Sequence, residues 1–201
     1  KKSFAGPLLK KEISAIDLII KNKKEPVTCI IGGSKISTKI NVIISLIEKI
    51  NTLIIVGAMA NNFFTYKNLK VGKSLTEHNT KDVIKKIYEK ANKNNCEIII
   101  PEDCVVSTSF EGEGKNKNLE QIEDDEIILD IGSNTVKKIR HIIEKSNTVL
   151  WNGPAGYFEN KNFLNGTMSI AEVISKNTHK KTLISVLGGG DTLAAVNKSK
   201  K

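Results

Sequence analysis

The fold of this chain is decided by residues 27–39, which read VTCIIGGSKISTK. The apolar run Val27–Ile31 predicts a buried strand, and the glycine pair Gly32–Gly33 ends it. Beyond the glycines, isoleucine recurs at steps of four, three, four and three residues, which is the spacing of one helical face. A strand, a glycine turn and an amphipathic helix are therefore expected in succession. The helical face is formed by Ile36, Ile40, Ile43, Ile47 and Ile50.

The same unit repeats along the rest of the chain. Short apolar runs predict strands, and most of them are followed by a stretch with helical spacing. This alternation is typical of an α/β, Rossmann-like domain of three layers, in which helices cover both faces of a mainly parallel sheet. The expected strands are Leu53–Val56, Glu97–Ile100, Thr148–Trp151 and Thr182–Leu187, and the expected helices lie at Met59–Lys67, from Val83 to Ala91, near Thr167–Ser175 and at Thr192–Lys198.

Two polar stretches break the alternation. Phe110–Asn118 is rich in Gly, Glu, Asn and Lys and is predicted to be a surface loop, and the acidic run Glu123–Glu126 is predicted to be a solvated turn. Elsewhere the strands end in glycine turns, and ligands of parallel sheets bind outside the carboxyl ends of the strands. We therefore expect four glycines to gather on one rim of the sheet, namely Gly33, Gly57, Gly153 and Gly188.

The composition argues against nucleic-acid and membrane partners. The formal net charge is +9, but the excess is almost entirely lysine, Arg140 is the only arginine, and aromatic residues make up 5%. Surfaces that read nucleic-acid phosphates favour arginine forks and stacked aromatic rings. No apolar run approaches the roughly 20 residues that a membrane span needs. We expect a monomer.

The cysteines and histidines predict no metal or nucleophile cluster. The cysteines are odd in number and lack CxxC spacing, so we expect reduced thiols in the core of a cytoplasmic protein. The first residues, KKSFAGP, lack an initiator Met and a signal peptide, which is typical of a fragment that starts mid-chain. The residues concerned are Cys29, Cys96 and Cys104, and the isolated His78, His141 and His179.

The segment Gly32–Lys39 carries two lysines beside a glycine turn. Gly33 lets a phosphate approach the backbone, and a helix N-terminus offers free N–H groups and positive potential. Lys35 and Lys39 stand four residues apart, so we expect them on one helical face, where two cations suit a polyphosphate. A plain turn with two solvated lysines is the alternative. Neither this segment nor Gly72–Ser74 fits the GxxxxGK[ST] pattern of a Walker A loop.

Residues 188–192, which read GGGDT, join another strand to a helix. Three glycines make a backbone concavity for an anion, and the carboxylate of Asp191 is suited to Mg²⁺. Thr192 is placed to cap the helix or to donate to a phosphate. The alternative is a flexible turn in which Asp191 serves as the N-cap.

Residues 151–159, which read WNGPAGYFE, form the third motif. A rigid proline, permissive glycines and a trailing Glu159 suit a loop that walls a flat ring and pairs with ribose hydroxyls. The alternative is a packed loop whose aromatic residues belong to the core.

Taken in order, six strings resemble the phosphoglycerate kinase family. They are GGSKISTK (32–39), IIVGAMANNF (54–63), VGKSL (71–75), LDIG (129–132), WNGPAGYFE (151–159) and GGGDT (188–192), and the resemblance covers nearly the whole chain. Residues 5–9, AGPLL, resemble the helix that joins that family's two domains. The resemblance implies the nucleotide-binding, carboxy-terminal half of a two-domain kinase, with residues 1–12 ending the interdomain helix and residues 13–201 forming the nucleotide domain.

The resemblance also implies an activity and a role for each motif residue. The family transfers a phosphoryl group between 1,3-bisphosphoglycerate and Mg-ADP, giving 3-phosphoglycerate and ATP in glycolysis. Lys39 is expected to bind the nucleotide phosphates, Lys35 to stabilise the group in transfer, Asp191 to hold Mg²⁺ and Glu159 to bind ribose. Gly33, Asn152, Gly188, Gly189, Gly190 and Thr192 are expected around the phosphates, and Gly57, Ala58, Leu75, Leu129, Pro154 and Tyr157 in the adenine slot.

Three departures from the family pattern carry expectations of their own. Val56 and Ala58 stand where glycines are usual, and Tyr157 replaces a smaller aliphatic residue, so these side chains are expected to narrow the adenine slot. The basic cluster that binds phosphoglycerate and the glycine-rich segment that follows GGGDT in the family are not found in this sequence. The 201 residues alone are therefore expected to bind nucleotide without catalysing the transfer.

Two other readings stay open. The chain also suits a generic nucleotide-binding α/β module without kinase chemistry, or a truncated remnant whose site no longer works. An arginine-rich α/β domain encoded upstream would favour the enzyme over both.

Overall fold

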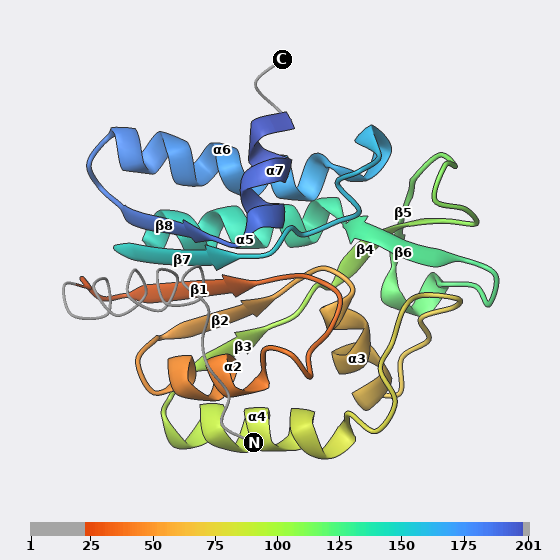
Figure 1. Ribbon diagram of the computed structural model, residues 1–201, viewed down its shortest axis with the longest axis horizontal. Coiled ribbons are helices and arrows are strands. Elements are labelled where there is room, and N and C mark those ends of the chain that lie inside the picture. The colour runs from red at the N-terminus through yellow and green to blue at the C-terminus, as the bar shows by residue number, and fades with distance from the viewer. Residues whose placement is uncertain (1–22, 199–201) are drawn as a thin grey trace, which may run out of the picture.

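The computed structural model describes residues 23–198, so the expected interdomain helix at residues 1–12 lies outside the described part (Figure 1). A five-stranded parallel sheet runs through the molecule in the order β3-β2-β1-β7-β8. Its strands are β1 (Val27–Ile31), β2 (Thr52–Ile55), β3 (Glu97–Ile99), β7 (Thr148–Asn152) and β8 (Ile184–Gly188).

Helices cover both faces of this sheet, which confirms the predicted three-layer α/β architecture (Figure 1). The helices of one face are α2 (Ile40–Ile47), α3 (Met59–Tyr66) and α4 (Lys81–Lys93), and those of the other are α5 (Ser133–Lys145) and α6 (Asn165–His179). The last helix, α7 (Gly190–Lys198), packs on α6 and β8. None of the helices in residues 23–198 is long and apolar enough to cross a membrane.

The two faces have separate cores, and alternate strand residues feed them. In β1, Cys29 and Ile31 pack with α2, α3 and α4, whereas Ile30 packs with α5 and α6. Because both faces are covered, every residue of β1 is buried. That explains why its sequence is apolar except for Thr28, whose buried hydroxyl is hydrogen-bonded to that of Ser146, rather than the polar–apolar alternation of a strand with one solvated face.

The three cysteines are free and buried, as predicted. Burial raises the pKa of Cys29 to about 12 and that of Cys96 to about 11. Burial likewise raises the pKa of Cys104 to about 12. All three are therefore protonated core side chains near neutral pH.

A second, antiparallel sheet was not predicted. It contains β4 (Asp103–Ser107), β5 (Lys115–Asn118) and β6 (Ile127–Ile131) in the order β5-β4-β6. The surface-loop prediction for Phe110–Asn118 is therefore wrong over its second half, because residues 115–118 pair with β4. Helix α5 was not predicted either, although Val136, Ile139 and Ile143 have helical spacing and are buried.

The prediction of a solvated turn at Glu123–Glu126 is wrong for its last residue. Glu126 is 6% exposed, and its carboxylate lies 2.7 Å from the Lys117 ammonium on β5. Burial works to raise the pKa of Glu126, but the hydrogen bonds from Lys117 and from the Glu123 N–H, together with the nearby lysine charges, hold the pKa below the ordinary value. The acidic run thus ties the turn before β6 to β5, which lies on the other side of β4 in the sheet.

A buried carboxylate from β4 caps helix α5. Gly132 precedes α5 and has no side chain to cap it, so Asp103 accepts the N–H groups of Asn134 (2.9 Å) and Thr135 (2.8 Å). The Thr135 hydroxyl donates to the same carboxylate at 2.6 Å. A Cβ on Gly132 would lie 2.2 Å from the Asp103 Cγ, so the close approach requires glycine.

We expect Asp103→Ala to lower the free energy of unfolding by about 3 kcal/mol, because several buried donors lose a charged acceptor. Burial works to raise the pKa of Asp103, but its hydrogen bonds, first that from Thr135, hold the pKa below 3.8. The stabilisation is therefore present above that pH and shrinks as the pH falls below it. Urea denaturation at pH 7 and pH 3 measures both effects.

The matched control for Asp103→Ala is Glu102→Ala. Glu102 is the adjacent acidic residue, and its carboxylate forms a half-exposed ion pair with Lys138. Such surface pairs contribute about 1 kcal/mol or less. Equal losses of stability in the two variants would contradict the capping role of Asp103.

Candidate functional site

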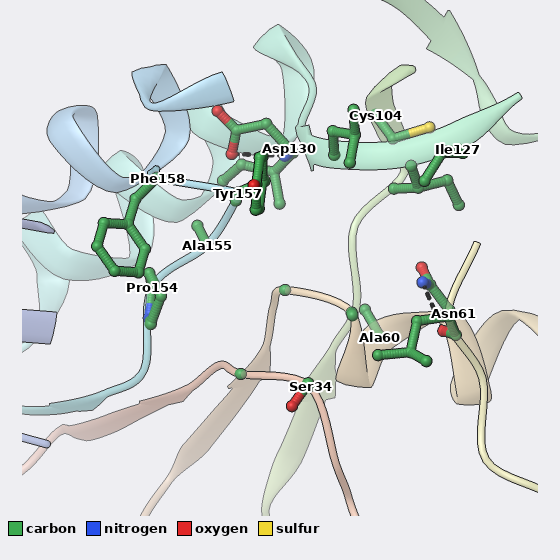
Figure 2. Close-up of a pocket in the computed structure, with 18 of the residues that line it drawn as sticks. Ser34, Ala60, Asn61, Cys104, Ile127, Asp130, Pro154, Ala155, Tyr157 and Phe158 are labelled. Carbon is green, nitrogen blue, oxygen red and sulfur yellow. Dashed lines mark hydrogen bonds between the residues drawn. The ribbon is translucent and has the colours of Figure 1, made fainter. Parts of the chain in front are cut away.

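A cavity of about 440 Å³ opens between the carboxyl ends of the parallel strands and strand β6. Figure 2 shows it between the turn after β1, at Ser34, and Ile127 on β6. The chain leaves β1 toward β2 on one side, and β7 pairs with β1 on the other. The cavity therefore lies where the strand order reverses, which is where open α/β sheets bind their ligands.

The strand register brings the glycine turns onto one rim. Ile31 is paired with both Ile55 and Asn152, and Asn152 with Gly188, so the four strands end level. A Cβ on Gly32 would lie 2.2 Å from the carbonyl oxygen of Pro154, so the β1 and β7 turns touch through their backbones.

Two other glycines of the rim also lie close to neighbouring groups. A Cβ on Gly57 (φ +67°) would lie 2.9 Å from the amide nitrogen of Gly33, and one on Gly188 would lie 3.1 Å from the Asn152 amide. The predicted gathering of the glycine turns is thus confirmed.

Lys39 connects the turns after β1 and β7. Its ammonium donates to the carbonyl of Gly32 at 2.9 Å and to the Asn152 Oδ1 at 2.7 Å. The same Nζ would lie 3.6 Å from a Cβ on Gly33. A cation is therefore held at the glycine rim by two neighbouring strands of the sheet.

The prediction that Lys35 and Lys39 share a helical face is wrong. Helix α2 begins at Ile40, and residues 36–39 form a turn, so exposed Lys35 precedes the helix. Glu77 holds this turn: its carboxylate accepts the N–H groups of Ile36 (2.5 Å) and Ser37 (3.1 Å) and the Ser37 hydroxyl (2.5 Å). Burial works to raise the pKa of Glu77, but the hydrogen bonds from Ser37 and Ile36 hold it below the ordinary value.

The GGGDT turn leads directly into α7. Asp191 is exposed in the first turn of that helix and lines the cavity. Thr192 is fully buried, and its hydroxyl oxygen accepts the Gly153 N–H at 2.7 Å. No group of three or more His, Cys, Asp and Glu suited to a metal ion lies within residues 23–198.

The segment after β7 forms one wall of the cavity. Its start is fixed by buried Trp151, whose indole N–H donates to the Gly153 carbonyl at 2.7 Å. Its middle is tied to β6, because the Tyr157 N–H donates to the Leu129 carbonyl at 2.7 Å. The Tyr157 and Phe110 rings pack in a T-shaped arrangement with the ring centres 5.1 Å apart. Beyond it, exposed Glu159 stands at the mouth of the cavity.

Val56 and Ala58 stand where the resemblance leads us to expect glycine, and only Ala58 lines the cavity. Val56 is fully buried in the core beneath α5 and α6 and does not narrow the slot as expected. The predicted residues that line the cavity are Gly33, Gly57, Ala58, Leu75, Leu129, Pro154, Tyr157, Glu159 and Asp191. The others lie outside its lining: Lys35, Lys39, Asn152, Gly188, Gly189, Gly190 and Thr192.

Two buried polar residues of the cavity wall were not predicted. Asp130 is 2% exposed and accepts the N–H groups of Ile131 and Gly166, each at 2.8 Å, and burial raises its pKa to about 7. Asn61 on α3 is 1% exposed and donates from Nδ2 to the Leu75 carbonyl at 3.0 Å. The only sequence signal for Asn61 is an asparagine pair inside a buried helix, MANNFFTY.

The arrangement suits a ligand with a flat apolar part and an anionic part. The apolar part of the wall offers side chains such as Leu75, Leu129 and Pro154. The adjoining rim offers the Lys39 ammonium, glycine backbone and the N-terminus of α7, all of which attract anions.

Comparison with known proteins agrees with this geometry. The family model described as phosphoglycerate kinase matches residues 1–201. Phosphoglycerate kinases of Wolbachia pipientis from Culex pipiens and of Xanthobacter autotrophicus are 45% and 40% identical to the chain over 97% of its length.

Solved structures agree as well. The phosphoglycerate kinase structure from Coxiella burnetii superposes with a TM-score of 0.86 at 36% identity, covering 96% of this chain and 50% of that one. The one from Pyrococcus horikoshii gives 0.74 at 26% identity, with 96% and 49% covered. The chain also spans about half the length of the curated relatives it matches, namely 50% of the two named above. Because the family model spans the whole chain, this protein belongs to the phosphoglycerate kinase family.

Proposed function

We propose that this chain supplies the ADP/ATP site of a phosphoglycerate kinase. In that enzyme a phosphoryl group passes between 1,3-bisphosphoglycerate and Mg-ADP, giving 3-phosphoglycerate and ATP. The observation that carries the proposal is a single cavity whose apolar wall adjoins a rim of glycine turns, a held lysine and a helix N-terminus. Residues 13–201 would be the nucleotide domain. The residues that bind phosphoglycerate would come from the other half of the enzyme.

The apolar wall is suited to the adenine ring. Ala58, Leu129 and Pro154 offer flat contact surface, and Tyr157 is steadied by its edge contact with Phe110. Glu159 at the mouth would accept hydrogen bonds from the ribose hydroxyls. This leaves the phosphates pointing along the rim toward Lys39.

The rim is suited to the phosphates. Gly189 has φ +87°, which lets the backbone turn sharply into α7 and present its N–H groups. Lys39 and the Thr192 hydroxyl would add a cation and a donor.

Asp191 fits Mg²⁺, because this ion is commonly held by one or two carboxylates together with nucleotide phosphates rather than by an all-protein cage. Bound there, Mg²⁺ would neutralise charge on the phosphate oxygens.

Lys35 would stabilise the group in transfer. Phosphoryl transfer depends mostly on positioning and on cations aimed at the moving charge. Lys35 is exposed on a turn that Glu77 fixes, so its ammonium is available to a group lying outside the cavity.

Free, buried thiols suit a reducing compartment. We propose that the enzyme acts as a monomer in the cytoplasm.

The first test is nucleotide binding by the 201-residue chain. We expect Mg-ADP to bind and Glu159→Gln to weaken binding about tenfold, because the ribose loses a charged acceptor. Isothermal titration calorimetry measures both affinities. The control is Glu144→Gln, which changes an exposed carboxylate on α5 and should leave affinity unchanged. Folded protein that gives no heat with millimolar nucleotide would favour the truncated remnant instead.

The second test is catalysis. Alone, the 201-residue chain should show no turnover in a coupled assay, because an oriented acceptor and exclusion of water are both required. Completed with the other half of the Wolbachia relative, it should turn over. Lys35→Ala should then lower kcat by roughly 100-fold while changing Mg-ADP affinity far less.

The control for Lys35→Ala is Lys86→Ala, an exposed lysine on α4. Turnover by the 201-residue chain alone would contradict the two-half account. Nucleotide binding without turnover in the completed protein would favour a binding module, and unchanged kcat in Lys35→Ala would make that lysine a solvated surface residue.

A further inference from the structure

One acceptor in the cavity wall is left without a hydrogen bond. Asn61 on α3 is 1% exposed, and its Oδ1 is buried yet accepts no hydrogen bond from any group in residues 23–198. Native proteins pair the large majority of such atoms, because a buried acceptor that loses water without gaining a donor is costly. The unpaired oxygen lies in the same wall that would receive the nucleotide base.

The amide of Asn61 cannot turn over to remove this mismatch. Its Nδ2 donates to the Leu75 carbonyl at 3.0 Å. Rotating the amide by half a turn would bring Oδ1 against that carbonyl, so two acceptors would face each other. The position of Leu75 therefore fixes Oδ1 as the free group.

The other buried polar side chain of the wall, Asp130, does not compete for this role. The two oxygens of Asp130 each accept a backbone N–H group already. Figure 2 shows the Asn61 amide directed toward Ile127, which also lines the cavity. A donor at the edge of a ring lying in this apolar part of the cavity would meet Oδ1.

We propose that the Oδ1 of Asn61 accepts a hydrogen bond from the exocyclic amine of adenine and so selects adenine nucleotides over 6-oxopurine nucleotides. This inference rests on the proposed function. A 6-aminopurine offers an N–H donor, whereas a 6-oxopurine presents a carbonyl oxygen, which would leave Oδ1 unpaired and repelled. Sites that hold an unpaired polar group discriminate strongly against a ligand that cannot satisfy it.

The test compares Mg-ADP with Mg-inosine diphosphate, whose base carries a carbonyl where adenine carries the amine. Calorimetry on the 201-residue chain should give at least tenfold tighter binding of ADP. In Asn61→Leu the preference should fall to near unity, mainly through weaker ADP binding. The matched control is Phe110→Ala, which removes apolar contact from the cavity and should weaken both nucleotides while keeping their ratio.

The wild-type comparison needs no variant, so it decides the matter even if Asn61→Leu fails to fold. Equal affinities of the wild type for the two nucleotides would overturn the inference and leave the proposed function standing. A preference that survives in folded Asn61→Leu would also overturn it. Absence of binding by either nucleotide would overturn the proposed function, and the role of Asn61 with it.

Discussion

The contact between two backbone turns is the constraint on which the site depends. The turns after β1 and β7 meet so closely that a Cβ on Gly32 would lie 2.2 Å from the Pro154 carbonyl oxygen. A larger residue at that position would separate the two central strands at their carboxyl ends. It would also separate the Gly32 carbonyl from Asn152, the two groups that together hold the Lys39 ammonium. The cavity wall, the Lys39 ammonium and the glycine rim thus all depend on the contact at Gly32, where there is no room for a side chain.

The second constraint is the way in which carboxylates from distant segments hold the helices and turns. Asp103 caps α5, Asp130 accepts an N–H group in the first turn of α6, and Glu77 holds the turn before α2. In each case the carboxylate belongs to a segment other than the one it holds. The parts around the cavity are therefore fixed to one another by charge-assisted hydrogen bonds as well as by apolar packing.

The parallel sheet and most of its helices were predictable, because their signal is local: a mostly apolar strand such as β1, a glycine, then helical spacing. The second sheet was not, since β5 reads KNKN and becomes a strand only by pairing with β4. The start of α2 was also missed, because the turn before it is held by Glu77, 41 residues from Ile36. The unpaired oxygen of Asn61 is visible only once its neighbours are in place, so no motif could have indicated it.

The three buried cysteines can report on local unfolding of the domain. Alkylating reagents react with the thiolate rather than the thiol. Burial raises the pKa of Cys29 to about 12, so this thiol is neither ionised nor in contact with solvent while the domain is folded. Cys29 lies in the central strand, Cys96 just before β3, and Cys104 in the second sheet. The order in which the three are alkylated would therefore report which part of the domain exchanges with unfolded conformations first.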